Sequence, residues 1–329
     1  MSKIAVIGAG TWGIALARML CLNGHEVRVW SALPEEIDEL SSTRVHKNLP
    51  GMEIPPSIVF SKSLEFVCSG SELILMAVPS AFVRSTARAV APFVAGQIIV
   101  DVAKGIEPDS MLTMSSVISS EIPGVPVVAL SGPTHAEEVA RDLPTTIVSA
   151  CPDMSAAALV QSVFSNSVMR VYTNTDILGV ELCGALKNII ALACGCLAGM
   201  GYGDNIRAAA ITRGLSEMRK IGLAMGCKAE TFSGLAGMGD LIVTATSVHS
   251  RNNKCGYLIG QGRDVSSAVA EVGMVVEGIS ALTAAVELAD KYGLEMPIIR
   301  AVDRVVNAGA DPRATVVELM AMEGVSEFD

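Results

Sequence analysis

The chain has 329 residues, half of them hydrophobic and 18% charged, which is enough for two domains with sizeable cores. Its net charge of −10, with Lys and Arg scattered, argues against a nucleic-acid partner, and no apolar stretch reaches the ~18–20 residues of a membrane span without interrupting glycines, so no membrane insertion is predicted. The eight cysteines show no metal-ligand spacing with histidine and the first residues lead directly into a strand pattern, so we expect a reduced, cytoplasmic protein without a resident metal.

Eight short apolar runs in the first half of the chain predict β-strands, over residues 3–8, 26–30, 57–60, 73–79, 97–105, 125–133, 145–150 and 168–173. Amphipathic stretches such as 13–24 and 81–94 lie between most of them and predict helices. Strands that alternate with helices are typical of a mainly parallel sheet with helices on both faces. We therefore predict an α/β fold in which residues 1–176 form a Rossmann-like, doubly wound domain.

A glycine-rich turn joins the first predicted strand to the first predicted helix. Its sequence, "GAGTWG", places Gly8, Gly10 and Gly13 in the G-x-G-x-x-G spacing, after a strand and at the start of a helix. Such glycines allow a tight turn and let the backbone approach a pyrophosphate at the helix N-terminus. The turn therefore predicts a dinucleotide-binding domain for NAD or NADP.

The end of the second predicted strand usually distinguishes these two cofactors, because an acid there suits the ribose of NAD and a base suits the phosphate of NADP. Here Trp30 is followed by "SALPEE" (31–36), with neither an acid nor a base directly after the strand. The sequence therefore leaves the preference open and predicts a discrimination of at most about a hundredfold. Three basic residues in the next loop either reach the adenosine ribose or form a solvated surface: Arg44, His46 and Lys47.

The second half of the chain has few strand patterns and predicts helices over residues 177–200, 204–225, 251–261, 264–272, 276–292, 296–308 and 312–322. We predict an all-helical C-terminal domain, residues 177–329, that carries the substrate and catalytic groups. The glycine-rich stretch "ETFSGLAGMGD" (230–240) is interpreted as part of a long connection between two of these helices.

Lys187 is the only charged side chain between Leu182 and Gly203, in a helix that is apolar on all sides and is therefore expected to be buried. Burial and a second nearby cation would lower the pKa of its ammonium enough for general-base work. Lys104, at the end of the strand run 97–105, is a candidate for that second cation, and Asp240 for orienting the ammonium and a substrate hydroxyl. The alternative is a lysine that extends to the surface.

A candidate anion site begins at Ser250, directly before the helix predicted at 251–261. Serine is a favoured helix N-cap, and the helix N-terminus together with Arg251 and Asn252 suits a phosphate. An ordinary capped helix is the alternative interpretation.

At these residues the chain resembles the bacterial NAD(P)-dependent glycerol-3-phosphate dehydrogenases. Nine motifs occur in the order of that family: "IGAGTWGIALA" (7–17), "NLPG" (48–51), "AVPS" (77–80), "AKGIE" (103–107), "SGPTHAEEV" (131–139), "GALKN" (184–188), "GLAGMGDL" (234–241), "SRN" (250–252) and "VVEG" (275–278). The resemblance implies the interconversion of sn-glycerol 3-phosphate and dihydroxyacetone phosphate, a small phosphorylated substrate at the entrance to glycerophospholipid synthesis. It also implies a homodimer.

The resemblance further implies roles for single residues, with Lys187 as the proton acceptor. The implied substrate contacts are Lys104, Gly132, Thr134, Lys187, Asn188, Asp240, Thr244, Ser250, Arg251 and Asn252. Together with the glycine turn, the implied cofactor contacts are Thr11, Trp12, Lys104, Ala136, Arg251, Val275 and Glu277. The chain departs from many relatives at Ser31-Ala32, where they carry His or Arg.

Two alternative functions remain at this stage. One is another two-domain NAD(P)-dependent dehydrogenase, acting on a 3-hydroxy acid or a sugar acid; the candidate phosphate site argues against it. The other is a dinucleotide sensor without activity, which would be expected to have lost Lys187 or Asp240.

Overall fold

The structure is a computed structural model that describes residues 1–324 and 326–327. Its first half contains one sheet whose strands are β1 (Lys3–Ile7), β2 (Glu26–Trp30), β3 (Val59–Phe60), β4 (Leu73–Met76), β5 (Ile98–Asp101), β6 (Val127–Ser131), β7 (Thr145–Ala150) and β8 (Met169–Asn174). Each of them coincides with or overlaps one of the eight predicted runs, so the strand predictions are confirmed.

The strand order is β3-β2-β1-β4-β5-β6-β7-β8, and all neighbours are parallel except β6 and β7. The predicted mainly parallel, doubly wound sheet is confirmed, and its first six strands have the order of a dinucleotide-binding fold. A parallel neighbour needs a crossover of a dozen or more residues, usually a helix. The segment between β6 and β7 contains only the short helix α6 (Ala136–Val139), and β7 returns antiparallel.

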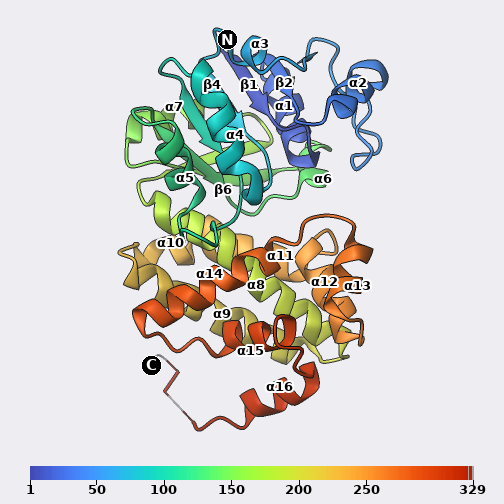
Figure 1. Cartoon of the computed structure of the whole chain (residues 1–329), viewed down its shortest axis with the longest axis vertical. Coiled ribbons are helices and arrows are strands. Elements are labelled where there is room, and N and C mark those ends of the chain that lie inside the picture. The colour runs from blue at the N-terminus through green and yellow to red at the C-terminus, as the bar shows by residue number, and fades with distance from the viewer. Residues whose placement is uncertain (325, 328–329) are drawn as a thin grey trace.

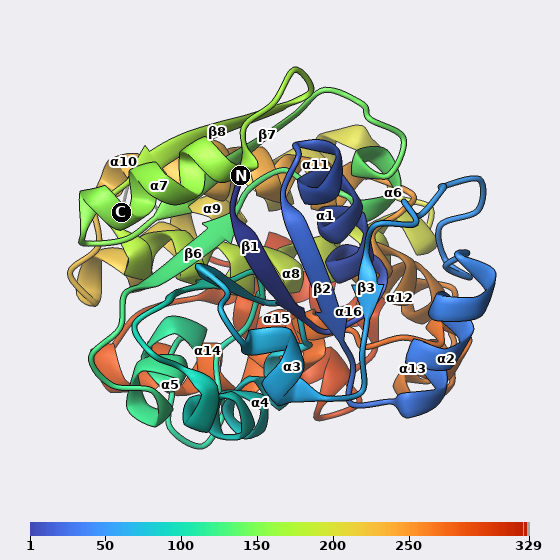
Figure 2. The same ribbon diagram turned by 90° about the horizontal axis from the view of Figure 1, so that it is seen from above.

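Helices cover both faces of this sheet (Figure 2). Side chains alternate along β1: Ile4 and Val6 belong to the core under α1 (Thr11–Leu22), α2 (Pro34–Thr43) and α7 (Met154–Phe164). Ala5 and Ile7 belong to the core on the opposite face, under α3 (Leu64–Cys68), α4 (Val83–Val90) and α5 (Met114–Glu121). This period of two, with apolar residues on both sides, is what a buried parallel sheet requires. Two short turns, η1 (Ser80–Phe82) and η2 (Ala91–Phe93), flank α4.

The second half is helical and lies below the sheet in Figure 1. Its helices are α8 (Ile177–Gly199), α9 (Asp204–Ala224), α10 (Ala229–Ser233), α11 (Asp240–Thr246), α12 (Arg251–Gly260), α13 (Val265–Val272), α14 (Glu277–Tyr292), α15 (Pro297–Val306) and α16 (Pro312–Met320). The seven predicted helices are confirmed, with ends that differ by up to two residues. By length and composition α8 could cross a membrane, but 83% of its most apolar window is buried inside the protein as the central helix of this half. The last positions of the predicted range 177–329 lie outside the described residues.

The prediction of a connection at 230–240 is wrong. This stretch continues α10 into a π-helical turn, η3 (Leu235–Gly239), which leads directly into α11. Its glycines serve close packing: a Cβ on Gly237 would lie 2.1 Å from the backbone oxygen of Phe232. The glycine content therefore suggested a loop, whereas the chain forms a closely packed π-helical turn that places Asp240 at the start of α11.

Glycines also bring α8 and α12 together backbone to backbone. A Cβ on Gly195 would lie 2.0 Å from the carbonyl oxygen of Asn253, and one on Gly256 would lie 2.0 Å from that of Leu192. No side chain fits between the two helices at these positions, so their crossing is fixed at a close distance. This contact holds the start of α12 beside the helix that carries Lys187.

Candidate active site

Lys187 lies in α8 and is only 4% exposed. Its ammonium pairs with the carboxylate of Asp240 and donates to Thr244 Oγ1 at 2.7 Å. Asp240 and Thr244 are one helical turn apart on α11. The Thr244 hydroxyl donates to the backbone oxygen of Asp240 at 2.7 Å, so its oxygen is oriented to accept from Lys187. The lysine does not extend to the surface, and that alternative is wrong.

Lys104 approaches the same carboxylate from the other domain. It follows β5, and its Nζ donates to Asp240 Oδ2 at 2.8 Å and to the carbonyl oxygen of Gly132 at 3.1 Å. Asp240 is fully buried, whereas 18% of the Lys104 side chain is exposed. One buried carboxylate is therefore shared by two lysines, one from each half of the chain, as the sequence predicts for the second cation.

The pKa of Lys187 reflects these surroundings. It is lowered to about 7: burial is the largest cause, the Asp240 carboxylate opposes it, and the Lys104 ammonium adds to the lowering. The direction is the one expected from the sequence. A lysine with this pKa exchanges a proton near neutral pH, which an ordinary lysine does not.

The loop after β6 lies against this pair. Gly132 accepts the bond from Lys104 and also one from Thr134 Oγ1 at 3.2 Å. Ala136 begins α6 just beyond it. The predicted contacts Gly132 and Thr134 are therefore beside the lysines, on the sheet side of the junction between the domains.

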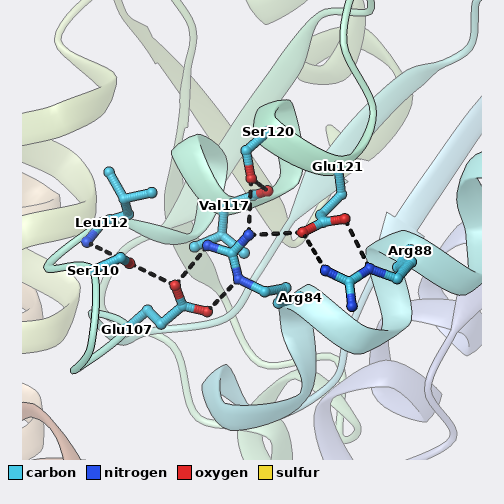
Figure 3. A network of polar contacts seen from close by, with 8 residues as sticks. All are labelled: Arg84, Arg88, Glu107, Ser110, Leu112, Val117, Ser120 and Glu121. Carbon is cyan, nitrogen blue, oxygen red and sulfur yellow. Dashed lines mark hydrogen bonds and ion pairs between the residues drawn. The ribbon is translucent and has the colours of Figure 1, made fainter.

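An ion-pair network holds the segment that carries Lys104 (Figure 3). Arg84 from α4 binds Glu107, three residues beyond Lys104, with contacts of 2.7 and 2.6 Å. Arg84 also binds Glu121 of α5 at 2.7 Å, and Arg88 binds the same carboxylate at 3.0 Å. The segment after β5 is thus tied to the two helices under it.

The start of α12 has the capped geometry that the sequence predicts. Ser250 Oγ accepts from the backbone N–H of Asn253 at 3.1 Å, so the serine is the N-cap. Arg251 is exposed, and one of its guanidinium nitrogens donates to the carbonyl oxygen of Val275 at 3.2 Å. A guanidinium has five N–H donors, so most of them remain for a ligand.

A buried pair of asparagines connects this helix start to α8 and α14. Asn252 Nδ2 donates to Asn188 Oδ1 at 2.9 Å, and Asn252 Oδ1 accepts from the backbone of Gly278 at 2.8 Å. Asn188 is adjacent to Lys187 in the chain. Buried hydrogen bonds therefore connect Asn252, in the predicted phosphate site, to Asn188, the residue next to the predicted base Lys187.

Glu277, at the start of α14, links the helical half to the sheet half. Its carboxylate accepts from Ser80 Oγ at 2.6 Å and from the Ser80 backbone at 3.3 Å. Val275, two residues before it, is 40% exposed. Glu277 thus lies at the junction between the two halves of the chain, with the exposed Val275 two residues before it.

The glycine turn fits a dinucleotide. Gly8 has a φ of 118°, and a Cβ there would lie 2.4 Å from the backbone oxygen of Ala77; one on Gly13 would lie 2.2 Å from that of Gly8. A Cβ on Gly10, by contrast, would have no neighbouring atom within 4 Å. The first turn of α1 carries no acidic residue. Tight packing on one side and open space at the helix N-terminus is the cradle that a pyrophosphate needs. Thr11 and Trp12 are half-buried in this turn.

The sequence analysis missed His135, which lies between Thr134 and Ala136. Burial lowers the pKa of His135, and the Lys187 ammonium lowers it further. Its ring centroid is 5.8 Å from that of His249, and among the described residues its buried Nε2 has no hydrogen-bond partner. A histidine inside the motif 131–139 was the available signal. No group of three or more His, Cys, Asp or Glu that suits a metal occurs within residues 1–324 and 326–327.

Comparison with known families is decisive at this point. Residues 3–157 match the family described as NAD-dependent glycerol-3-phosphate dehydrogenase N-terminus, and residues 176–317 match the C-terminus of the same family. The chain belongs to the NAD(P)-dependent glycerol-3-phosphate dehydrogenases.

Similar proteins agree over the full length. Glycerol-3-phosphate dehydrogenase [NAD(P)+] 2 of Lactobacillus delbrueckii subsp. bulgaricus is 64% identical, over 100% of this chain and 99% of the relative. Glycerol-3-phosphate dehydrogenase [NAD(P)+] of Agathobacter rectalis is 51% identical, over 97% of this chain and 96% of the relative. The crystal structure of glycerol-3-phosphate dehydrogenase from Coxiella burnetii has a TM-score of 0.94 and 36% identity, over 98% of this chain and 99% of that one.

Membership in this family confirms the resemblance, the enzyme class and the use of NAD(P) that the sequence predicts. The chain is an oxidoreductase that interconverts sn-glycerol 3-phosphate and dihydroxyacetone phosphate. The two alternatives, a hydroxy-acid or sugar-acid dehydrogenase and an inactive sensor, are not favoured.

Proposed function

We propose that Lys187 moves the proton of this reaction. In alcohol oxidation its neutral amine accepts the proton of the C2 hydroxyl of sn-glycerol 3-phosphate while the hydride leaves C2, and the carbonyl of dihydroxyacetone phosphate forms. The nicotinamide ring, when bound, accepts that hydride and supplies it in the reverse direction. The observation that carries this proposal is a buried lysine whose pKa is lowered to about 7.

Asp240, Lys104 and Thr244 set the state of that lysine. Asp240 fixes the ammonium and Thr244 accepts one of its hydrogens, which leaves the remaining direction for substrate. Lys104 helps to lower the pKa of Lys187, and we propose it as a contact for both substrate and cofactor; its bond to Asp240 supports this role. Gly132, Thr134 and Asn188 complete the proposed substrate pocket through their contacts around these groups.

The start of α12 is the proposed phosphate anchor. Ser250, Arg251 and Asn252 combine a helix N-terminus with an exposed guanidinium, and both favour an anion. Arg251 also reaches Val275, so the anchor adjoins the proposed cofactor side. The full proposed cofactor set is Gly8, Gly10, Thr11, Trp12, Gly13, Lys104, Ala136, Arg251, Val275 and Glu277.

We further propose that the enzyme is a cytoplasmic homodimer that feeds glycerophospholipid synthesis. Exposed apolar side chains on and after α16 support an interface in the helical half: Val317 is 63%, Met320 70% and Met322 56% exposed. The proposed boundary between the two domains is 176/177, where α8 begins directly after its N-cap Asp176. Sedimentation velocity tests the dimer.

Dihydroxyacetone-phosphate-dependent oxidation of NADH and NADPH, measured side by side, tests the reaction. We expect turnover with the phosphorylated ketone and little with a 3-keto acid. Absence of turnover with dihydroxyacetone phosphate by a folded, cofactor-binding protein would contradict the proposal.

Arg251→Ala tests the anchor. A charge-assisted hydrogen bond contributes about 1.5–3 kcal/mol, so kcat/KM for dihydroxyacetone phosphate should fall by roughly 10- to 150-fold. Unphosphorylated dihydroxyacetone never uses this contact and should lose much less. Equal proportional losses with both ketones would assign Arg251 to the cofactor or to the structure instead.

A further inference from the structure

The carboxyl end of β2 carries an acid that the linear sequence does not place there. Ser31 directly follows the strand and is 8% exposed. Its hydroxyl donates to Glu36 Oε2 at 2.6 Å and accepts from the backbone N–H of Leu33 at 3.2 Å. Glu36 belongs to the first turn of α2, and the chain folds back so that its carboxylate meets the strand end. Its second oxygen remains available as an acceptor.

This carboxylate is close to the glycine turn. Glu36 acts electrostatically on His46, a residue that is 4% exposed and that hydrogen-bonds the backbone of Ala9, between Gly8 and Gly10. The acid, the imidazole and the glycine turn are therefore neighbours. In a doubly wound sheet the adenosine ribose binds between the glycine turn and the end of the second strand, where an acid accepts a hydrogen bond from the ribose 2′-hydroxyl.

The basic residues of this region have other partners. Arg44 donates to the carbonyl oxygen of Ile58 at 2.8 Å, and its guanidinium carbon lies 5.1 Å from the ring centroid of Phe60. Lys62 pairs with Asp38 at 2.7 Å. Burial lowers the pKa of His46, so this imidazole is a poor cation at neutral pH. Lys47 is exposed. Of these four basic residues, Arg44, Lys62 and His46 thus have partners or surroundings that disfavour contact with a 2′-phosphate.

We propose that Glu36, held by Ser31, makes this enzyme selective for NAD over NADP. The carboxylate accepts a hydrogen bond from the 2′-hydroxyl of NAD and repels the 2′-phosphate of NADP. The inference rests on the proposed dinucleotide site at the glycine turn. It replaces the expectation of weak discrimination from the sequence: we expect NADH to bind at least a hundredfold more tightly than NADPH.

The test is a matched pair of charge removals, Glu36→Gln and Glu35→Gln. Both remove one negative charge from the first turn of α2, but no contact joins the exposed Glu35 to Ser31 within the described part of the chain. Dissociation constants for NADH and NADPH are measured by nicotinamide fluorescence, and adenosine 2′,5′-bisphosphate and 5′-AMP serve as displacing probes. We expect Glu36→Gln to reduce the NADH preference at least tenfold, chiefly through tighter NADPH binding. Glu35→Gln should leave the ratio within twofold, and Ser31→Ala should give an intermediate change.

Two results would overturn the inference. One is an unchanged ratio in a Glu36→Gln variant whose thermal unfolding matches the parent. The other is an equal change in both glutamine variants, because the net charge of the helix would then be responsible. Turnover separates this inference from the proposed function. If the enzyme reduces dihydroxyacetone phosphate equally well with both cofactors, the proposed reaction stands and the proposed role of Glu36 is wrong.

Discussion

Asp240 and Asp101 are two buried acids with opposite surroundings. Asp240 is fully buried and is shared by Lys187 and Lys104. Asp101, the last residue of β5, is 1% exposed and is only three residues before Lys104. Its nearest charged influence is another acid, Glu181 of α8, and its Oδ2 has no hydrogen-bond partner among the described residues.

The difference shows how partners decide the charge of a buried group. Burial raises the pKa of Asp101 well above its usual value, and the Glu181 carboxylate raises it further. Burial also raises the pKa of Glu181, although the backbone and hydroxyl of Ser115, each at 2.6 Å, oppose this. Two lysines contact the buried carboxylate of Asp240, and there it is the pKa of Lys187 that is lowered to about 7. The fold therefore keeps a titrating amine at the proposed site of proton transfer, whereas it raises the pKa of the acids Asp101 and Glu181.

The largest expected effect comes from removing that amine. Lys187→Met keeps the length and the apolar stem, so the variant should fold and bind NADH, because the glycine turn lies in the other domain. General acid–base groups contribute typically ~10²–10⁴-fold, and kcat should fall by at least that range in both directions. The measurements are kcat, NADH affinity by fluorescence and thermal unfolding. A folded variant within about tenfold of the parent would make Lys187 a packing residue.

The pH dependence of the parent enzyme should follow the same group. Ketone reduction requires the ammonium, so its kcat should be constant below pH about 7 and fall about tenfold per unit above it. Alcohol oxidation requires the neutral amine, so its kcat should rise with pH up to about 7 and be constant above it. Stability should rise with pH from about 7 towards the ordinary lysine value, because the unfolded chain binds a proton that the folded chain has released. A reduction rate that is flat to pH 9 would contradict the assignment.

Lys104→Met should shift this profile. The Lys104 ammonium lowers the pKa of Lys187 and also occupies one oxygen of Asp240, so its removal acts twice in the same direction. The apparent pKa of the reduction limb should rise by about one to two units. Because Lys104 is also a proposed ligand contact, KM should rise as well. The shift of the pH profile of kcat, however, is expected only when the charge of residue 104 is lost. Lys104→Arg keeps the charge and should keep the limb near the parent position.

The sequence predicted the strands, the main helices and the burial of Lys187 better than it predicted the environment of the site. Lys187 was recognisable because a lone charge in an apolar helix is costly without a partner. The helical turn before Asp240 was missed, since glycines needed for close packing look the same in a sequence as glycines of a loop. Glu36 and His135 were missed because their positions depend on how α2 and the loop after β6 fold back, which no local pattern encodes. The electrostatic effect of Glu181 on Asp101 acts between residues 80 positions apart in the sequence, so it required the tertiary structure.

The smallest effect is expected for Asp101→Asn, and the same substitution at Asp240 is its control. The folded state retains a proton on Asp101 that the unfolded chain releases above its ordinary pKa of about 3.9, so this acid makes stability decline as pH rises. Asparagine removes that decline. Relative to the parent, the variant should therefore gain stability as the pH rises from 6 to 8, and its activity should stay within about threefold of the parent activity. Asp240→Asn removes the carboxylate between two lysines and should cost roughly 3–5 kcal/mol of unfolding free energy. Chemical denaturation of both variants at two pH values measures the contrast, and similar losses in the two would show that Asp101 is ionised in the folded protein.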